Sequence, residues 1–402
     1  MPSLKINCRL AGIALLLIQP VRAVSADSVA VLPLFNQTKA PNLDWIGESV
    51  SETIRESLAS EGLLALSRED RMEVFRRLSI RPNAVLTRAS VLKVGEALDA
   101  ARIIFGQYEI PVEEGVNANA KGTIKLSARV VDLKRLKAGP EFEASGPLED
   151  LSALETHLAW QFVRHLAPQS APSEEEFRRV RPPVRVDAIE NYTRGLLANS
   201  LEQKQKLFAQ AAHLDERFSE PCFQLGRIFW EKKDYHSAAQ WLAKVNSGDS
   251  HYLDAMFLLG LTRYYQGDFA GAASQFQLVA GQAPLNEVYN DLGAAQSRRN
   301  LPEAVESFKK ALEGDEADPD YWFNEGYALW KARSFDAAAE KFRSVLDRTP
   351  NDGEATVLLG RCLKDDGPRA AELREGKERL KENFELTAFR QLQAEIGAKR
   401  SK

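Results

Sequence analysis

The amino-terminal half of the chain alternates between continuous apolar runs and apolar residues spaced four apart. Residues 29–34 form an apolar run, which is typical of a strand buried on both faces, and Pro33 indicates a bulge or the end of this strand. Residues 43–60 are expected to form an amphipathic helix. Its apolar stripe consists of Ile46, Val50, Ile54 and Leu58.

The alternation of strand and helix patterns continues to residue 168. Residues 123–131 alternate between apolar and polar side chains, which predicts a half-exposed antiparallel strand. Further strands are expected at 63–66, 102–110 and 141–145, helices at 68–78, 90–98 and 151–166, and a polar loop at 111–121. Residues 27–168 should therefore form an α/β domain, a mixed sheet packed with helices.

The first 26 residues have the three parts of a secretory signal peptide. A positive start is followed by a short apolar run, residues 10–18, and then by small residues before Asp27. A helix of that run is about 14 Å long, too short to cross a hydrocarbon core of about 30 Å. Cys8 precedes the run, which disfavours lipid attachment. We expect cleavage between Ala26 and Asp27 and a periplasmic or secreted protein.

Four runs of the α/β domain can be compared with known envelope proteins: VAVLPLFNQT, LDWIGESVSETIRESLASEGLLALSRED, VGEALDAARIIFGQYEI and IKLSARVVDL. They resemble the amino-terminal domain of TolB and the related FlgO and CsgG-like envelope domains of bacteria. Those domains share a strand ending in a Pro-Phe/Leu-Asn turn, a long helix after a Gly-containing turn, and a later strand that contains a glycine. The resemblance implies a non-catalytic domain that is periplasmic or associated with the outer membrane.

The carboxyl-terminal half repeats itself. Residues 169–187 hold prolines and both signs of charge, which predicts an exposed linker. Beyond them, glycines recur at spacings of 34, 33, 33 and 34 residues: Gly226, Gly260, Gly293, Gly326 and Gly360. In three of these units an alanine follows after twelve residues and a leucine or phenylalanine after sixteen. This pattern resembles the tetratricopeptide repeat, because the period and the offsets agree together.

The resemblance implies an all-α solenoid of about five to six repeats over residues 188–373, with a degenerate first unit around Gly195. Small residues allow the two helices of a repeat to cross closely. Residues 375–398 are expected to form a polar helix that caps the open end, so residues 374–402 are assigned to a capping helix and tail. The predicted fold class is multidomain, an α/β domain followed by this solenoid.

A solenoid of this kind has a concave surface lined by the first helix of each pair. At the lining offsets of the family the side chains are mainly aromatic and cationic, types that dominate binding hot spots. Packing between repeats is the alternative role for each ring. The residues expected to form a groove for a protein or peptide are Phe223, Arg227, Trp230, Phe257, Tyr264, Asn290, Arg298, Phe323, Tyr327, Trp330, Arg361 and Lys364.

Composition and charge exclude several classes of function. The chain has 53 Lys+Arg and 57 Asp+Glu, so it lacks the basic excess of a nucleic-acid-binding protein. No HExxH, GxSxG or glycine-rich phosphate loop occurs, and we expect no catalysis, cofactor or metal. Asp315, Asp318 and Asp320 lack the spacing of a calcium loop and are expected in a turn. Cys222 and Cys362 lie four repeats apart, too far for a disulfide.

Three functions are compatible with these features. The first is a non-catalytic scaffold or adaptor of the cell envelope, which binds a protein or peptide in the groove and another envelope component through the α/β domain. The second is an enzyme or ligand sensor that uses the α/β domain, with the repeats recruiting a substrate. The third is a cytoplasmic signalling adaptor whose apolar run is not cleaved.

Cleavage after Ala26 separates the first function from the third. We expect the exported chain to begin at Asp27, because small residues follow an apolar run of signal length. The intact mass of the protein in an envelope fraction measures this. A chain that still begins at Met1 there would contradict it.

Overall fold

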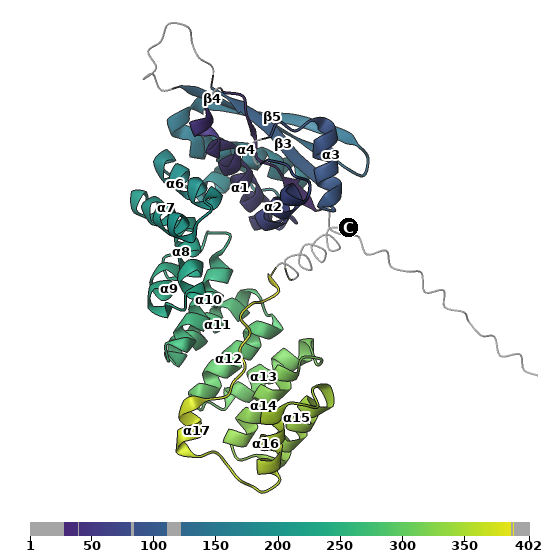
Figure 1. Ribbon diagram of the computed structural model, residues 1–402, viewed down its shortest axis with the longest axis vertical. Helices are drawn as coiled ribbons and strands as arrows, with labels where there is room; N and C mark the ends of the chain where they lie inside the picture. Colours follow the sequence, from purple (N-terminus) through teal and green to yellow (C-terminus); the bar gives the residue numbers. More distant parts are fainter. Residues whose placement is uncertain (1–27, 39, 82–83, 111–121, 387–388, 390–402) are drawn as a thin grey trace, which may run out of the picture.

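The protein consists of an α/β domain followed by a helical solenoid, which confirms the predicted fold class (Figure 1). The computed structural model describes residues 28–38, 40–81, 84–110, 122–386 and 389. The predicted signal peptide with its cleavage site, and the loop expected at 111–121, lie outside these residues. No helix in the described part of the chain is long and apolar enough to span a bilayer.

The sheet of the α/β domain has the order β1-β3-β4-β5, and β2 also pairs with β3. β1 and β2 run parallel to β3, whereas β4 is antiparallel to both β3 and β5. Pairing is interrupted between β1 and β2, where Pro33 has no N–H to donate. The strands are β1 (Val29–Val31), β2 (Phe35–Asn36), β3 (Arg102–Glu109), β4 (Thr123–Asp132) and β5 (Lys137–Pro147).

Helices cover both faces of this sheet, as the apolar run of β1 predicted. Val29 and Val31 belong to the core under α1 (Trp45–Ser60) and α4 (Leu151–Leu166). Ala30 belongs to the core under α2 (Arg68–Arg77) and α3 (Arg88–Ala97). The predicted stripe of α1 is fully buried: Ile46, Val50, Ile54 and Leu58. The antiparallel strand predicted at 123–131 is confirmed as β4.

Two strand predictions differ from the structure in extent. Residues 63–66 form only a single bridge, between Ala65 and Val29. The edge strand expected at 141–145 is longer, because β5 pairs along nearly all of β4. Two 3₁₀ turns, Pro41–Leu43 and Leu148–Asp150, lead into α1 and α4.

Residues 169–187 connect the two parts and most of them are exposed, as predicted, but a section of this segment packs against the α/β domain. This segment contains α5 (Glu174–Arg179), which has a capping box at Ser173 and a fully buried Phe177. Arg181 stacks on the Phe177 ring at 3.8 Å and forms an ion pair with Glu61 at 3.1 Å. This section is therefore packed against the α/β domain, because one apolar side chain anchors it.

The solenoid is a row of antiparallel helix pairs. In each pair the first helix carries the motif glycine and the second carries the ring or leucine that follows it. The helices are α6 (Val186–Leu197), α7 (Leu201–Leu214), α8 (Glu220–Glu231), α9 (Tyr235–Leu242), α10 (Tyr252–Tyr265), α11 (Phe269–Gln282), α12 (Asn286–Arg298), α13 (Glu303–Gly314), α14 (Pro319–Lys331), α15 (Phe335–Arg348) and α16 (Gly353–Cys362). Cys222 and Cys362 are buried free cysteines, as predicted.

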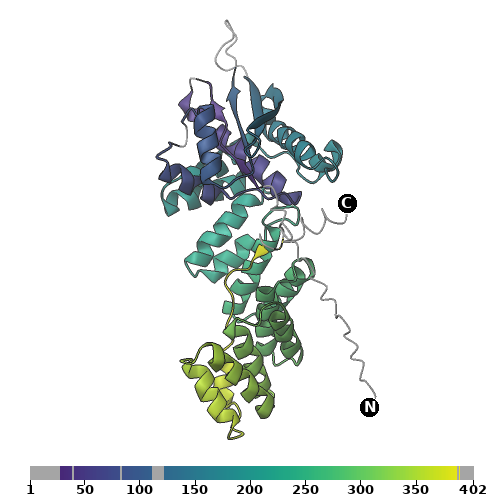
Figure 2. The ribbon, with the colours of Figure 1, turned by 90° about the vertical axis from the view of Figure 1, so that its right-hand side faces the viewer.

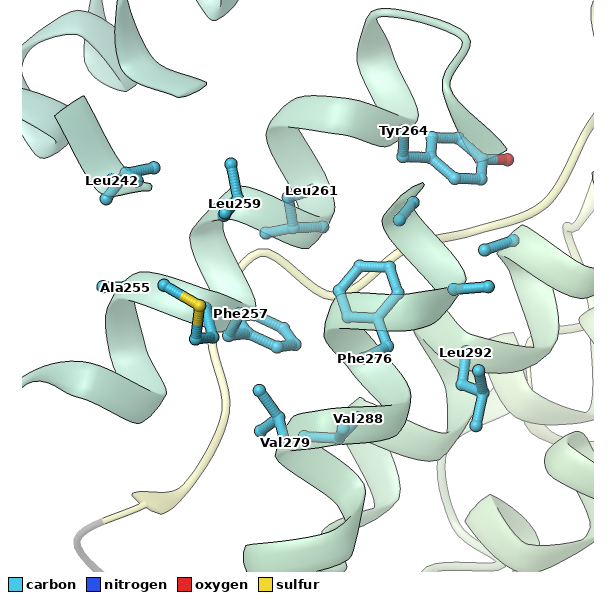
Figure 3. Close-up of a cluster of buried hydrophobic side chains, with 14 of the residues drawn as sticks. Leu242, Ala255, Phe257, Leu259, Leu261, Tyr264, Phe276, Val279, Val288 and Leu292 are labelled. Carbon is cyan, nitrogen blue, oxygen red and sulfur yellow. The ribbon is translucent and has the colours of Figure 1, made fainter. Parts of the chain in front are cut away.

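Four motif glycines, Gly195, Gly226, Gly260 and Gly293, lie directly under a large side chain on the second helix of their own repeat. A Cβ at Gly260 would lie 2.6 Å from the Phe276 ring, and one at Gly293 would lie 2.7 Å from Phe308. Gly195 in the degenerate first unit is equally close to Phe208. Figure 3 shows the Phe276 ring in the apolar cluster that continues into the next repeat through Val288 and Leu292.

The prediction of a capping helix over 375–398 is wrong for residues 376–385, whereas Leu386 and Phe389 are helical. The helix before them, α17 (Ala370–Glu375), has only six residues. Residues 376–385 are not helical and run back along the solenoid (Figures 1 and 2). We call residues 376–386 the tail segment. Because the tail segment is not a helix that packs on α16, no described aromatic ring of a second helix covers Gly360. A Cβ built at Gly360 would have no described atom within 4 Å.

The α/β domain and the first repeats line a pocket of about 310 Å³ between them. Glu155 of α4 lines it, is 2% exposed, and accepts a hydrogen bond from the Thr53 hydroxyl at 3.1 Å. Burial raises the pKa of Glu155 to about 7, although the hydroxyls of Ser49 and Thr53 oppose this. His251 of the solenoid approaches Glu56 on the other side of the junction, at 3.7 Å. The junction is thus rich in buried carboxyl groups.

Gly260→Ala is expected to lower the free energy of unfolding by about 1–3 kcal/mol, because the added methyl group overpacks the Phe276 contact. Gly360→Ala is the matched control at the same motif position. This change is expected to raise the free energy of unfolding by about 0.5–1 kcal/mol, because alanine has a higher helix propensity than glycine. Urea unfolding followed by circular dichroism measures both values. Effects of the same sign would contradict the packing role of the glycine.

Glu155→Gln is expected to stabilise the protein at pH 8 and to change little at pH 4. The unfolded chain loses this proton near pH 4.5, whereas the folded chain keeps it until about pH 7, so wild-type stability falls across that window. This pKa shift corresponds to a loss of about 3 kcal/mol in the free energy of unfolding of the wild-type protein at high pH. Urea unfolding at both pH values measures the difference. Exposed Glu202→Gln is the control, and a gain at pH 8 no larger than the control's would refute the assignment.

Candidate functional site

The concave side of the solenoid holds the tail segment. The first helices of successive repeats, α10, α12 and α14, contact it one after another. From α17 it passes α14 and α12, reaches α10, and ends at a cavity shared with the α/β domain. Figures 1 and 2 show it running back along the solenoid. The groove predicted from the sequence is therefore occupied in this structure by the chain itself.

The tail segment enters the groove through a turn at Gly376. Its φ of 68° lies in the left-handed region, and a Cβ there would lie 2.1 Å from the Arg298 guanidinium. Arg298 donates hydrogen bonds of 2.6 Å to the carbonyl oxygens of Arg374 and Glu375. These bonds hold the last turn of α17, so the chain is directed back along the solenoid.

Two asparagines bind the main chain of the tail segment at Arg379. The Arg379 N–H donates to Asn324 Oδ1 at 2.8 Å. The Arg379 carbonyl oxygen accepts from Asn324 Nδ2 at 2.7 Å and from Asn290 Nδ2 at 2.8 Å. Both asparagines are fully buried, and Asn324 also donates to Asn290 Oδ1 at 2.8 Å. These bonds hold the backbone at Arg379 and do not involve its side chain.

The Arg379 guanidinium lies between an aromatic ring and three carboxylates. It stacks over Phe323 at 3.6 Å from the ring centroid. It forms ion pairs with Asp352 at 2.8 Å, Asp320 at 3.3 Å and Glu354 at 3.5 Å. Burial alone would raise the pKa of Asp352, but the hydrogen bonds from Arg379 lower it below its usual range. This pocket fits a planar cation.

The next cation of the tail segment uses the same acidic surface. Lys381 Nζ lies 2.7 Å from both Asp318 and Asp320. Its main-chain N–H donates to Asp291 Oδ1 at 2.9 Å. Asp320 therefore lies between two cations that are two residues apart in the tail segment.

The acidic residue before Arg379 lies in a pocket of opposite character. The Glu378 side chain is fully buried and accepts a hydrogen bond from the Ser297 hydroxyl at 2.8 Å. Lys331 Nζ lies 3.4 Å away, and burial lowers the pKa of this lysine although Glu378 opposes the shift. The Tyr264 hydroxyl approaches Glu378 at 3.5 Å.

Apolar residues of the tail segment also pack against the solenoid. Leu380 and Phe384 pack against the buried cluster of the middle repeats, and Phe384 lies 4.5 Å from Phe257 between ring centroids. Figure 3 shows Phe257 within that cluster. A cavity of about 740 Å³ remains between this end of the tail segment and residues 62–70 of the α/β domain.

The structure brings most of the predicted groove residues to this surface. Phe257, Tyr264, Asn290, Arg298 and Phe323 contact the tail segment or the turn before it. Phe223 and Arg227 line the remaining cavity. Arg361 binds Glu372 of α17 at 2.6 Å, and Lys364 is exposed.

Three predicted aromatic residues have a packing role. Tyr327 and Trp330 are buried, with 0% and 1% exposure, and the Trp330 indole N–H donates to the Asp366 carbonyl oxygen. Trp230 packs against Tyr235 and Tyr265. For Trp230 the alternative role of packing between elements is the observed one, whereas Tyr327 and Trp330 also line a pocket of about 300 Å³ together with Lys377 of the tail segment.

Sequence analysis missed several residues that contact the tail segment. Asn324 was overlooked because a fixed offset from Gly326 selects its neighbour Phe323. Its spacing of 34 residues from Asn290 was the available signal. Asp318 and Asp320 lie at the start of α14, near the turn where they were expected, but they also hold Lys381. The others are Asp291, Ser297, Lys331, Asp352 and Glu354.

Comparison with known proteins agrees with the repeat pattern. A family model described as tetratricopeptide repeat matches residues 223–287, 293–353 and 323–373. No curated protein matches the chain in sequence.

Three solved structures illustrate the extent of the likeness. The crystal structure of YrrB, "a TPR protein with an unusual peptide-binding site", is 20% identical, covers 44% of this chain and 92% of its own, and has a TM-score of 0.39. MamA from Desulfovibrio magneticus RS-1 is 21% identical, with coverages of 41% and 95% and a TM-score of 0.37. The LpoB carboxyl-terminal domain from Salmonella enterica is 14% identical, with coverages of 31% and 84% and a TM-score of 0.23. These scores say nothing about function. The family match and the glycine-on-ring packing together identify tetratricopeptide repeats within residues 223–373.

Proposed function

We propose that this protein is a non-catalytic adaptor that binds an extended segment of a partner protein in the concave groove. The observation that carries this proposal is the pair Asn290 and Asn324, which bind both main-chain groups of Arg379. Main-chain recognition by buried amides requires an extended segment but no particular sequence. A concave surface of stacked helix pairs is well suited to such a segment.

The location of the adaptor is a second part of the proposal. The signal-like first 26 residues and the resemblance of the α/β domain to TolB-type envelope domains support a periplasmic protein. In this proposal the α/β domain binds another envelope component, and the groove presents the partner segment beside it.

The test uses a full-length chain in which the tail segment no longer competes. We define the released variant as Glu378→Ala/Arg379→Ala/Lys381→Ala, which removes the polar side chains that hold the tail segment. Circular dichroism checks that the variant is folded. An array of 12-residue peptides of random sequence then reports which extended segments it binds.

Adding Asn324→Leu to the released variant is expected to lower its affinity for the peptides about thirtyfold. The change removes two main-chain hydrogen bonds, worth about 1 kcal/mol each. Adding Asn199→Leu, at an exposed position outside the groove, is the control and should change nothing. Failure of the released variant to bind any peptide, or equal binding with and without Asn324, would refute the proposed function.

A further inference from the structure

We infer that the partner segment carries an acidic residue, then arginine, an apolar residue and lysine, and that the tail segment is its competitor within the same chain. This inference rests on the proposed function, because it assigns the chemistry of the segment that the groove binds. The tail segment shows which charge occupies each position, since its residues Glu378 to Lys381 contact the groove one by one.

The groove has a fixed order of charge along its length. Near α17 the pocket of Ser297 and Lys331 receives a carboxylate that is fully buried. One residue further, Asp320, Asp352 and Glu354 surround a guanidinium. A carboxylate in the second pocket would face like charges, and a guanidinium in the first would face Lys331. The order acidic then basic is therefore specified by repulsion as well as by attraction.

The spacing of the pockets fits an extended chain. In such a chain alternate side chains point to opposite sides, and residues two apart lie about 6.6 Å from one another. Arg379 and Lys381 both reach Asp320 from one side. Leu380, between them, packs against the apolar cluster of the repeats. A helical segment would not place two cations on one carboxylate at a spacing of two residues.

The contacts of the tail segment can be reproduced by another chain. Its main chain is held by side chains of α12 and α14, and its residues 376–385 form no strand or helix. Its cations share Asp320, which is 32% exposed, and such pairs are individually weak, whereas Asp352 is nearly buried and binds Arg379 through both carboxylate oxygens. The short connection from α17 also gives the competitor a high effective concentration, in the millimolar range.

The experiment measures binding of a fluorescent peptide with the sequence of residues 376–386. The released variant is expected to bind this peptide at least tenfold more tightly than the wild-type chain does, because the competitor is weakened. A control peptide of identical composition exchanges the glutamate and arginine that correspond to positions 378 and 379. It is expected to bind the released variant at least tenfold more weakly than the native order.

A second variant tests the competition even where the released variant does not fold correctly. Gly376→Ala opposes the turn that directs the tail into the groove and leaves every groove side chain intact. It should also increase peptide affinity over wild type. Arg374→Ala is the control for charge, because like the released variant it removes a net charge of +1, and no ion pair of the Arg374 side chain is formed with the described residues. It should bind the peptide as the wild-type chain does.

Each outcome decides a separate point. Equal binding of the two peptides would overturn the inferred charge order, and equal affinity of wild type, released variant and Gly376→Ala would overturn the competition. In either case, array peptides that depend on Asn324 would leave the proposed function standing. A dimer of Gly376→Ala in light scattering would assign the groove to a second copy of this chain and overturn the inference of a separate partner.

Discussion

The solenoid depends on the contact between a glycine on the first helix of a repeat and a large side chain on the second. A Cβ at Gly195, Gly226, Gly260 or Gly293 would lie 2.5–2.7 Å from that side chain. Only glycine allows this approach, and the approach fixes how the two helices cross. Each first helix is thereby held in line with the next, so their free faces form one continuous groove.

This contact also explains which features could be predicted from the sequence. The glycine and the ring recur with a constant offset, so the repeats and their concave surface follow from spacing alone. The strands and helices of the α/β domain follow from equally local patterns, such as the buried stripe of α1. The packing of residues 169–187 could not be found in this way. It depends on the single buried side chain of Phe177, which composition does not distinguish from a solvated linker.

The path of the tail segment could not be predicted from local sequence patterns, for a different reason. Its lysines, glutamates and leucines favour a helix by propensity. The left-handed turn at Gly376 ends α17, and the amides of Asn290 and Asn324 then replace intrahelical partners for the main chain at Arg379. These partners lie 55 residues or more away in the sequence. Tertiary contacts thus override helix propensity here.

The position of the tail segment links the groove to the α/β domain. Phe384 and Leu386 line the same cavity as residues 62–70 of that domain. An occupant that displaces the tail segment removes these side chains from the junction unless it supplies equivalent ones. The free energy of binding in the groove is therefore coupled to the free energy of packing at the junction. Thermodynamic linkage requires that each changes the other by the same amount. In the proposed competition, a component bound to the α/β domain at residues 62–70 would accordingly change how readily a partner segment displaces the tail segment.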